Sequence, residues 1–404
     1  MSTLDYRSRP ARRVRRRDVD EFCRVEWPER LRETGSIAAK GALRMGVPPL
    51  TLAVDGTSWT FVPEAGTIRA IRDQPGADLS ARLDAAAFSE LIDDHRSTLG
   101  LSVAGRIELT GGDGGDLINW DVVLRAALDG QAVFEPGSIA LQSREGALLD
   151  LTRRFQRDTD PSELRAFLQP AGFLCIESVF TGDEMQRVSD DLDSAAHAAT
   201  PDDGTSWWVR TKAGTRRPSR ILNFLRQSTH LQALVKDGRF LGLGAIPGHG
   251  HVHSDSFGEH FAEPSAEGLV KPVGVTEGIS DLGWHKDCAR GGHSRFCCGL
   301  TIGIAVTDAD EDSGELRVVA GSHRTNLPAA GLAEDVDLPV VAIPTRAGDV
   351  TIHCSCTLHE ARPPRTKERK VVYTGFGLPP KFEDDEPTDI GALARDRANI
   401  GKMG

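Results

Sequence analysis

Length, composition and charge set the first limits on what this chain can be. It has 404 residues, of which 39% are apolar and 26% are charged, and its formal net charge is −11. This composition allows a sizeable core and excludes a chain that is disordered throughout, and the length predicts two domains. The acidic balance argues against a general nucleic-acid binder, because phosphate recognition needs clustered Lys and Arg.

Three further features of the sequence bear on the cellular location of the chain and on its contacts. The seven cysteines are scattered and include no Cys-x-x-Cys pair, a pattern that predicts reduced thiols in the cytoplasm. The sequence contains no run of about 18 apolar residues, so it predicts no membrane-spanning helix. Seven arginines lie within the first 17 residues. Residues 1–29 are therefore expected to form a basic, solvated arm, with contact to an acidic partner as the alternative.

Residues 30–145 predict a small α+β domain with a meandering sheet. Asp55-Gly56 stands between the alternating segments Leu50–Val54 and Ser58–Val62, which indicates a β-hairpin. The elements expected after it are a strand near Ile68, a helix at Ala85–Ile92, a strand at Arg106–Thr110 and a helix at Ile118–Leu128.

The order of these elements resembles that of sterol-carrier-protein-like domains. Ala77-Asp78-Leu79 and Gly105-Arg106 occupy the matching places in two of the strands. The resemblance implies a hydrophobic tunnel for a lipid-like ligand. The alternative is a degenerate domain that serves dimerisation or packing.

A linker is expected between residues 135 and 160, and residues 146–404 predict a second, mainly β domain. It opens with a helix at Pro161–Leu168, a buried strand at Gly172–Phe180 and a helix capped by Thr181-Gly-Asp-Glu184. Short strands separated by Gly, Asp and Pro turns then predict a double-sheet barrel. They are expected at Leu300–Val306, Glu315–Val319, Val340–Pro344, Asp349–His353 and Lys370–Phe376. The ending, residues 377–404, is acidic and is expected to wrap the surface.

The candidate chemistry lies in three segments of this second domain. His285 and Asp287 are two residues apart, which on a strand puts both side chains on one face. His359 offers a third ligand from another strand. Two histidines and one carboxylate that leave the other coordination positions open are typical of iron(II) oxygenases.

An arginine follows the third ligand in the sequence at a spacing that suits cosubstrate binding. Arg369 lies ten residues after His359 and opens a predicted strand. A dicarboxylate cosubstrate that chelates iron at one end needs a cation at its far carboxylate, and arginine provides a permanently charged, two-pronged donor. Arg365 is the rival for this role, although it lies closer to His359.

Together these segments resemble the phytanoyl-CoA dioxygenase family over residues 160–378. The likeness includes Trp284-His285-x-Asp287, the stretch Gly314–His323, Gly348-Asp349, Thr357-Leu-His359 and Arg369. The resemblance implies a double-stranded β-helix, or jelly roll, preceded by the smaller α+β domain. It also implies that His285, Asp287 and His359 bind iron(II), that Arg369 binds 2-oxoglutarate, and that dioxygen is the second cosubstrate.

One position departs from the family pattern. Family members often have Ser or Thr two residues after the distal histidine to help hold 2-oxoglutarate, and here that residue is Ala361. Thr301 and Tyr373 are the candidates for the missing hydroxyl. Both are expected to bind the cosubstrate.

Three other histidines are alternatives to these ligands. His253-Ser-Asp255 repeats the ligand spacing but lacks the Gly-Trp that precedes His285, so we expect a substrate-facing or plain polar loop there. His323 belongs to a Gly-Ser-His turn and is expected to be structural. His353 lies six residues before His359 and is expected to point away from the pocket.

The expected reaction is hydroxylation of an unactivated C–H bond in a small or lipid-like, hydrophobic or acyl-like molecule. Desaturation, epoxidation and ring rearrangement begin from the same hydrogen abstraction and are the alternative outcomes. A carboxylate at position 287 disfavours a halogenase, which needs that coordination position vacant. Substrate contacts are expected from Trp207, Trp208, Arg210, Arg220 and Asn223. The alternatives are a lipid carrier with an inactive oxygenase domain and a metal-dependent cupin-type isomerase, which would not need Arg369.

Overall fold

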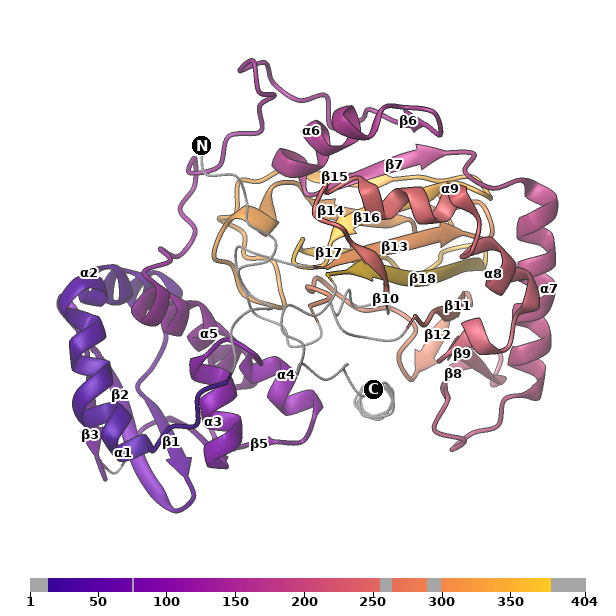
Figure 1. The fold of residues 1–404 in the computed structure, drawn as a ribbon. Helices are drawn as coiled ribbons and strands as arrows, with labels where there is room; N and C mark the ends of the chain where they lie inside the picture. Colours follow the sequence, from indigo (N-terminus) through magenta and orange to yellow (C-terminus); the bar gives the residue numbers. More distant parts are fainter. Residues whose placement is uncertain (1–13, 75, 255–263, 289–298, 379–404) are drawn as a thin grey trace.

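The computed structural model describes residues 14–74, 76–254, 264–288 and 299–378. The chain forms an N-terminal group of elements and a larger C-terminal group, drawn in indigo to purple and in magenta to yellow in Figure 1. The N-terminal elements are α1 (Val19–Glu21), the π-helical turn η1 (Phe22–Glu26), α2 (Trp27–Met45), β1 (Leu50–Val54), β2 (Thr57–Glu64), β3 (Thr67–Arg72), β4 (Leu79–Leu83), α3 (Ala85–Ile92), α4 (Thr98–Val103), β5 (Ile107–Gly111) and α5 (Gly114–Asp129).

The N-terminal sheet has the strand order β3-β2-β1-β4-β5. The predicted hairpin is confirmed: β1 and β2 pair antiparallel, and Asp55 and Gly56 in the turn both have positive φ. The predicted meander is wrong, because β4 does not pair with β3. It lies parallel to β1, with Leu50 opposite Leu79 and their buried positions in register. This pairing puts the apolar residues of both strands on the same face of the sheet.

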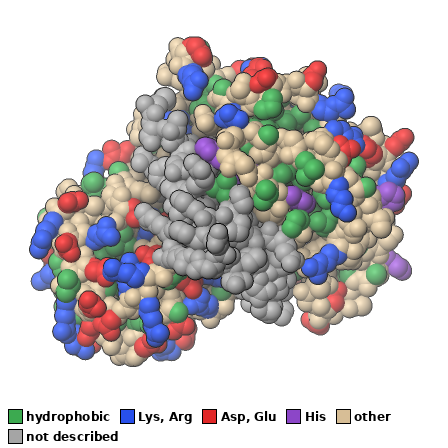
Figure 2. Space-filling model, in the orientation of Figure 1, with side chains coloured by type: hydrophobic (Ala, Val, Ile, Leu, Met, Phe, Trp, Pro, Cys, Tyr) green, Lys and Arg blue, Asp and Glu red, His purple; other side chains and the backbone are tan. Residues whose placement is uncertain are grey.

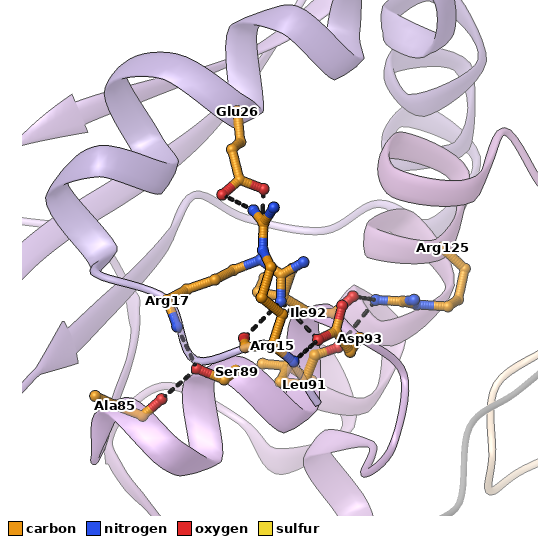
Figure 3. Close-up of polar contacts among 9 residues, drawn as sticks. All are labelled: Arg15, Arg17, Glu26, Ala85, Ser89, Leu91, Ile92, Asp93 and Arg125. Atoms are coloured by element: carbon orange, nitrogen blue, oxygen red, sulfur yellow. Dashed lines mark hydrogen bonds and ion pairs between the residues drawn. The ribbon is translucent and has the colours of Figure 1, made fainter. Parts of the chain in front are cut away.

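The folded part of the chain begins earlier than the sequence predicts. Residues 1–13 lie outside the described residues, but Phe22 and Trp27 are buried in the N-terminal core. Arg15 and Arg17 both pair with Glu26, and Arg17 also pairs with Asp93 at 2.7 Å (Figure 3). The expected solvated arm at residues 1–29 is therefore wrong for its second half, because apolar side chains and ion pairs fix it to the domain.

The long helix α2 was not predicted either, and its buried face explains why. Apart from Trp27, the buried residues of α2 are Gly35, Ala38, Gly41 and Ala42. Such small residues give no hydrophobic stripe in the sequence, but they let the helix approach its neighbours closely. A Cβ on Gly41 would lie 2.7 Å from a methyl group of Val133.

The C-terminal group is a double-stranded β-helix, as predicted. Its elements are β6 (Phe155–Gln156), α6 (Pro161–Ala171), β7 (Phe173–Glu177), α7 (Gly182–Ala198), β8 (Ser206–Thr211), β9 (Arg216–Ile221), η2 (Phe224–Arg226), α8 (Thr229–Leu234), α9 (Gly238–Leu241), η3 (Gly242–Ala245), β10 (Val252–Ser254), β11 (Glu267–Lys271), β12 (Val275–Glu277), β13 (Leu300–Ala305), β14 (Leu316–Val319), η4 (Ser322–Arg324), β15 (Val340–Ile343), β16 (Val350–Cys354), β17 (His359–Ala361) and β18 (Arg369–Gly377). The expected capping box at Thr181 and Glu184 is present at the start of α7.

The strands of this half form a large and a small sheet. The large sheet has the order β12-β8-β9-β11-β18-β13-β16-β7-β6, with β10 beside β18, and the small sheet has the order β15-β14-β17. One face of the central strands carries Leu300, Ile302 and Ile304, which belong to the same core as Val188 and Leu192 of α7. The other face carries polar residues such as Thr301 and His353. Polar residues on this face of the sheet mark the place to look for a site.

The two groups meet through a short segment before β15. The side chain of Asn326 donates to the backbone carbonyls of Val122, at 2.8 Å, and Gln131, at 2.9 Å. Phe134 packs with Leu327, Leu338 and Leu358 in a third apolar cluster, and Trp284 packs against it. The predicted division at residue 146 stays a prediction.

A buried lysine reaches toward this contact from the predicted metal segment. The ammonium group of Lys286 donates to the carbonyl of Leu327 at 2.8 Å, and its charge acts on Asp121 of α5. Asp121 accepts hydrogen bonds from the backbone and the hydroxyl of Thr98. Burial nevertheless raises the pKa of Asp121 to about 7.

The surface drawn in Figure 2 carries basic and acidic side chains side by side over the N-terminal elements. Ion pairs between exposed side chains of the N-terminal elements include Arg82 with Glu108 and Arg69 with Glu64. Within the described ranges, no helix is both long enough and apolar enough to cross a bilayer. The expected acidic wrap at residues 377–404 lies almost wholly outside the described residues.

Candidate metal centre

The structure brings together the three predicted ligands His285, Asp287 and His359. His285 lies in an extended segment that forms two bridges, one to Ala330 and one to His359. The backbone groups of His285 and His359 exchange two hydrogen bonds of 2.9 Å. Asp287 follows two residues later, so its side chain returns to the same side as that of His285. Lys286, between them, points the other way and is buried.

Both histidine rings present Nε2 to a common centre. Nδ1 of His285 lies 2.7 Å from the carbonyl of Gly283, and Nδ1 of His359 lies 2.9 Å from the carbonyl of Thr357. A carbonyl only accepts, so Nδ1 of each ring carries the proton and Nε2 keeps its lone pair for a metal. The Asp287 carboxylate lies 3.4 Å from one Nε2 and 3.5 Å from the other.

The donor set fits a metal ion of the predicted kind. One atom from each of His285, Asp287 and His359 lies within 4.8 Å of the other two. Burial and the neighbouring His359 lower the pKa of His285, so its ring stays neutral. Burial opposes the charge on Asp287, but the three neighbouring histidines outweigh it and hold the pKa of Asp287 well below its usual value. Two neutral imidazoles and one carboxylate are what an iron(II) triad needs.

A fourth side chain lies at this centre, and the prediction for it was wrong. His353 was expected to point away, but its Nε2 lies 3.1 Å from Oδ2 of Asp287. Its ring centre is 4.3 Å from that of His359. The six-residue spacing to His359 predicted the wrong orientation for His353, because β16 ends at Cys354 and a turn follows before β17. The alternation Val350, Thr351, Ile352, His353 within β16 was the signal that could have found it.

Arg369 lies on β18 and faces the interior of the barrel. Its side chain is buried, one Nη donates to the carbonyl of Gly314 at 2.8 Å, and the other lies 3.4 Å from the hydroxyl of Tyr373. The structure pairs Arg369 with no carboxylate among the residues that it describes. The rival Arg365 is exposed and pairs with Glu311 at 2.7 Å. Of the two arginines, only Arg369 is a buried cation without an acidic partner among those residues.

A second buried cation lies on the strand beside Arg369. Lys271 of β11 is opposite Arg369 in the sheet, and its ammonium group lies 2.5 Å from Asp281. Burial, and then the charge of Arg369, lower the pKa of Lys271 to about 8, although Asp281 opposes this shift. Asp281 thus balances the charge of Lys271, whereas the structure gives Arg369 no carboxylate among the described residues.

Residues 168–372, which include His285, Asp287, His359 and Arg369, match the family model for phytanoyl-CoA dioxygenase. The match spans just over half of the chain. The chain belongs to the phytanoyl-CoA dioxygenase family. Enzymes of this family depend on iron(II), 2-oxoglutarate and dioxygen, so the chain is a 2-oxoglutarate-dependent oxygenase with iron(II) as its cofactor.

Three similar solved structures cover between 54% and 64% of the chain. AviO1 from Streptomyces viridochromogenes is 19% identical, with a TM-score of 0.43 over 55% of this chain and 96% of that one. EctD from S. alaskensis, with 2-oxoglutarate and 5-hydroxyectoine, is 17% identical, with a TM-score of 0.45 over 64% and 92%. HygX from Streptomyces hygroscopicus, with nickel, 2-oxoglutarate and hygromycin B bound, is 20% identical, with a TM-score of 0.39 over 54% and 86%. A comparison with curated proteins found no match.

In this phytanoyl-CoA dioxygenase family member, the two candidate hydroxyls lie at different places. Thr301 is opposite His353 in the sheet, and its hydroxyl lies 3.1 Å from that of Ser355. The hydroxyl of Tyr373 contacts Arg369. Ala361 offers no hydroxyl, but its carbonyl accepts a hydrogen bond from Lys271. Of the two candidates, Tyr373 is the one that the structure puts beside the arginine.

The five predicted substrate contacts divide into two groups. Trp207 is buried, the guanidinium of Arg220 lies 4.2 Å from its ring centre, and Arg220 pairs with the buried Glu267 at 2.9 Å. Trp208 donates to Ser206 and Arg210 pairs with the exposed Glu277, while Asn223 adopts a left-handed backbone before η2. Arg220 is opposite Leu269, and Leu269 is opposite Val371, so Arg220 lies on the face of the sheet that carries Arg369 and Tyr373.

The second His-x-Asp pattern is not part of this centre. His253 lies on β10, and its Nε2 is 2.7 Å from the hydroxyl of Thr374. Its ring packs against Phe240 and Phe376, and burial lowers its pKa to about 4. Asp255, the second residue of that pattern, lies outside the described residues.

Proposed function

We propose that the chain is an iron(II)- and 2-oxoglutarate-dependent hydroxylase in which His285, Asp287 and His359 hold the iron. The observation that carries the proposal is the orientation of the two rings. Each donates Nδ1–H to a backbone carbonyl and turns Nε2 toward the Asp287 carboxylate. Histidines that bind metals are commonly fixed in this way by a hydrogen bond from the other ring nitrogen.

We assign the far carboxylate of 2-oxoglutarate to Arg369. A buried guanidinium without an acidic partner is unfavourable unless an anion joins it. The carbonyl of Gly314 and the hydroxyl of Tyr373 orient the guanidinium, which leaves its other N–H groups available to a carboxylate. Lys271, one strand away, is balanced by Asp281, so Arg369 is the cation left for the carboxylate.

Bound iron(II) supplies the redox chemistry that couples the two oxidations in this class. One dioxygen is consumed: one of its atoms enters the C–H bond of the substrate to give an alcohol, and the other enters succinate as 2-oxoglutarate loses carbon dioxide. The residues of this chain fix the geometry for it. The carbonyls of Gly283 and Thr357 orient the imidazoles, and Asp287 would supply the carboxylate ligand, which favours oxygenation over halogenation.

The substrate in this proposal is a small organic molecule, hydrophobic or acyl-like as the N-terminal resemblance implies. Trp207 and Arg220 are its proposed contacts, since they share a face of the sheet with the arginine site. The cytoplasm is the proposed location, on the cysteine pattern of the sequence. Lipid transfer without oxidation, and isomerisation without 2-oxoglutarate, are the competing activities.

Succinate formation tests the proposal. The full chain would be loaded with Fe(II) without oxygen, mixed with 2-oxoglutarate in air, and assayed for succinate with and without added fatty acids, acyl thioesters and small polar metabolites. We expect slow succinate release without substrate and faster release with a suitable one, and Asp287→Ala should abolish both. A wild-type chain that forms no succinate but binds a fluorescent fatty acid would favour the carrier. Turnover that needs no 2-oxoglutarate and survives Arg369→Leu would favour the isomerase.

A further inference from the structure

His353 is buried at the metal centre, and none of the predicted roles uses it. Its side chain is 0% exposed, and Nε2 lies 3.1 Å from Oδ2 of Asp287. A carboxylate oxygen only accepts a hydrogen bond, so Nε2 carries the proton and donates it. Nδ1 has no hydrogen-bond partner among the described residues. Asp287 is therefore the polar contact that accounts for the orientation of this ring.

The sheet holds His353 rigidly in this place. β16 pairs on both sides, so that His353 is opposite Thr301 on one neighbouring strand and Phe173 on the other. Its ring also lies 4.3 Å from the ring of His359. A donor fixed by two neighbouring strands can orient a carboxylate more tightly than a donor on a loop.

His353 is not one of the three residues that cluster as metal ligands. The atoms that lie within 4.8 Å of one another belong to His285, Asp287 and His359, and His353 is not among them. Its contact is to the carboxylate. Groups that hold a metal ligand from behind fix its orientation and tune its basicity.

We propose that His353 is a positioning residue, which holds one oxygen of Asp287 by a hydrogen bond and so leaves the other oxygen to bind the iron. This inference rests on the proposed function of the same site. A triad of this kind works because it leaves coordination positions open for cosubstrates. A carboxylate that bound through both oxygens would take up one of those positions. His353 prevents this.

Cobalt(II) is the probe for this role, since its visible absorption reports the number and kind of ligands. The full chain and its variants would be titrated with Co(II) without oxygen, and the dissociation constant and the absorption spectrum would be measured. We expect His353→Phe to raise the dissociation constant by about 10- to 100-fold and to change the spectrum. His353→Gln keeps an N–H donor at this place and should restore most of the affinity and the wild-type spectrum.

The matched control is His253→Gln. His253 is a half-buried histidine of the large sheet, but it shares a face with Phe376 and hydrogen-bonds Thr374, so its side chain lies on the opposite face from His353. We expect its Co(II) affinity and spectrum to equal those of the wild type. His353→Leu replaces the Phe variant if circular dichroism shows that the larger ring disturbs the fold.

Two results would overturn the positioning role. One is wild-type affinity and spectrum in His353→Phe or His353→Leu. The other is a loss of one nitrogen ligand in the spectrum of both His353→Phe and His353→Gln, which would make His353 a ligand. Asp287→Ala keeps the two proposals apart. If that variant binds Co(II) as the wild type does, the metal site itself is wrong, whatever the His353 variants do.

Discussion

The two halves of the molecule place their charges differently. In the N-terminal half, most ion pairs lie at the surface, as with Arg82 and Glu108, and the core consists of residues such as Phe22, Trp27 and Phe61. In the C-terminal half, ionisable side chains such as His353, Arg369, Lys271 and Glu267 are buried inside the barrel. Buried charge is costly unless it is paired or meets a ligand. These buried ionisable groups lie in the half that binds the iron and 2-oxoglutarate.

The N-terminal half also buries some polar side chains, and one of these interacts with a charge of the other half. Asp121, Arg125 and Thr98 are buried polar residues on α5 and α4. The positive charge of Lys286, the residue between two proposed iron ligands, favours the ionised form of Asp121. We therefore expect changes within the barrel to alter catalysis. Changes at α5 should alter the stability of the segment that carries His285 and Asp287.

The largest effect is expected from Arg369→Leu. Removing a charged, two-pronged donor should raise the KM for 2-oxoglutarate by about 100-fold, which corresponds to about 2.7 kcal/mol. Succinate formation over a range of 2-oxoglutarate concentrations measures it. Arg365→Leu is the control, since Arg365 is exposed and pairs with Glu311, and its KM should equal that of the wild type. The reverse result would move the cosubstrate site to Arg365.

The next largest effect is expected from Asn326→Ala, which tests the link between the halves. This change leaves the carbonyls of Val122 and Gln131 without their donor. Unsatisfied buried acceptors should lower the free energy of unfolding by about 2 kcal/mol, measured in urea. The Co(II) dissociation constant should rise as well, because Leu327 and Ala329 accept hydrogen bonds from Lys286. Unchanged metal affinity in a destabilised variant would limit the link to stability.

A smaller effect, seen as pH dependence, is expected from Asp121. Burial raises its pKa to about 7, so the folded protein holds a proton that the unfolded chain has already released. Its contribution to stability is therefore fully present below about pH 4 and is lost as the pH rises through 7. Asp121→Asn removes this titration. The fall in Tm between pH 5 and pH 7.5 should be smaller in the variant than in the wild type, and an equal fall would show that Asp121 is ionised throughout.

The smallest effect is expected at the rim of the contact between the halves. Arg44 of α2 pairs with Asp335 at 2.6 Å, but both side chains are partly exposed. Exposed ion pairs contribute about 0.2–1 kcal/mol, so Arg44→Ala should change the free energy of unfolding by less than about 0.5 kcal/mol. A loss as large as that of Asn326→Ala would mean that the rim and the centre of this contact contribute alike.

Much of the fold could be read from the sequence because its signals are local. The Asp55-Gly56 turn, the capping box at Thr181 and the alternating strands of the barrel each depend on a few neighbouring residues. Helix α2 could not be found by its hydrophobic pattern, because it packs through Gly35, Ala38 and Gly41. Its other signals were present, with Pro28 in its first turn and Gly46 in a left-handed conformation at its end.

The site shows the same division between local and distant information. Residue types and spacing were enough to choose His285, Asp287 and His359, and the structure brings these three together. His353 was misplaced because a turn separates it from His359, and spacing along the chain says little across a turn. The position of His353 opposite Thr301 depends on how strands far apart in the sequence pair, which local residue patterns do not show.

The apolar cluster around Phe134 has a practical consequence for attempts to separate the halves. Phe134 and Ile139 come from the segment before residue 146, while Val319, Leu327, Leu338 and Leu358 come from the barrel. A chain shortened to residues 146–404 would keep the barrel side of this cluster and expose it to water. Exposed apolar patches of this kind promote self-association. The oxygenase half on its own should therefore be less soluble than the whole chain, even with its metal site intact.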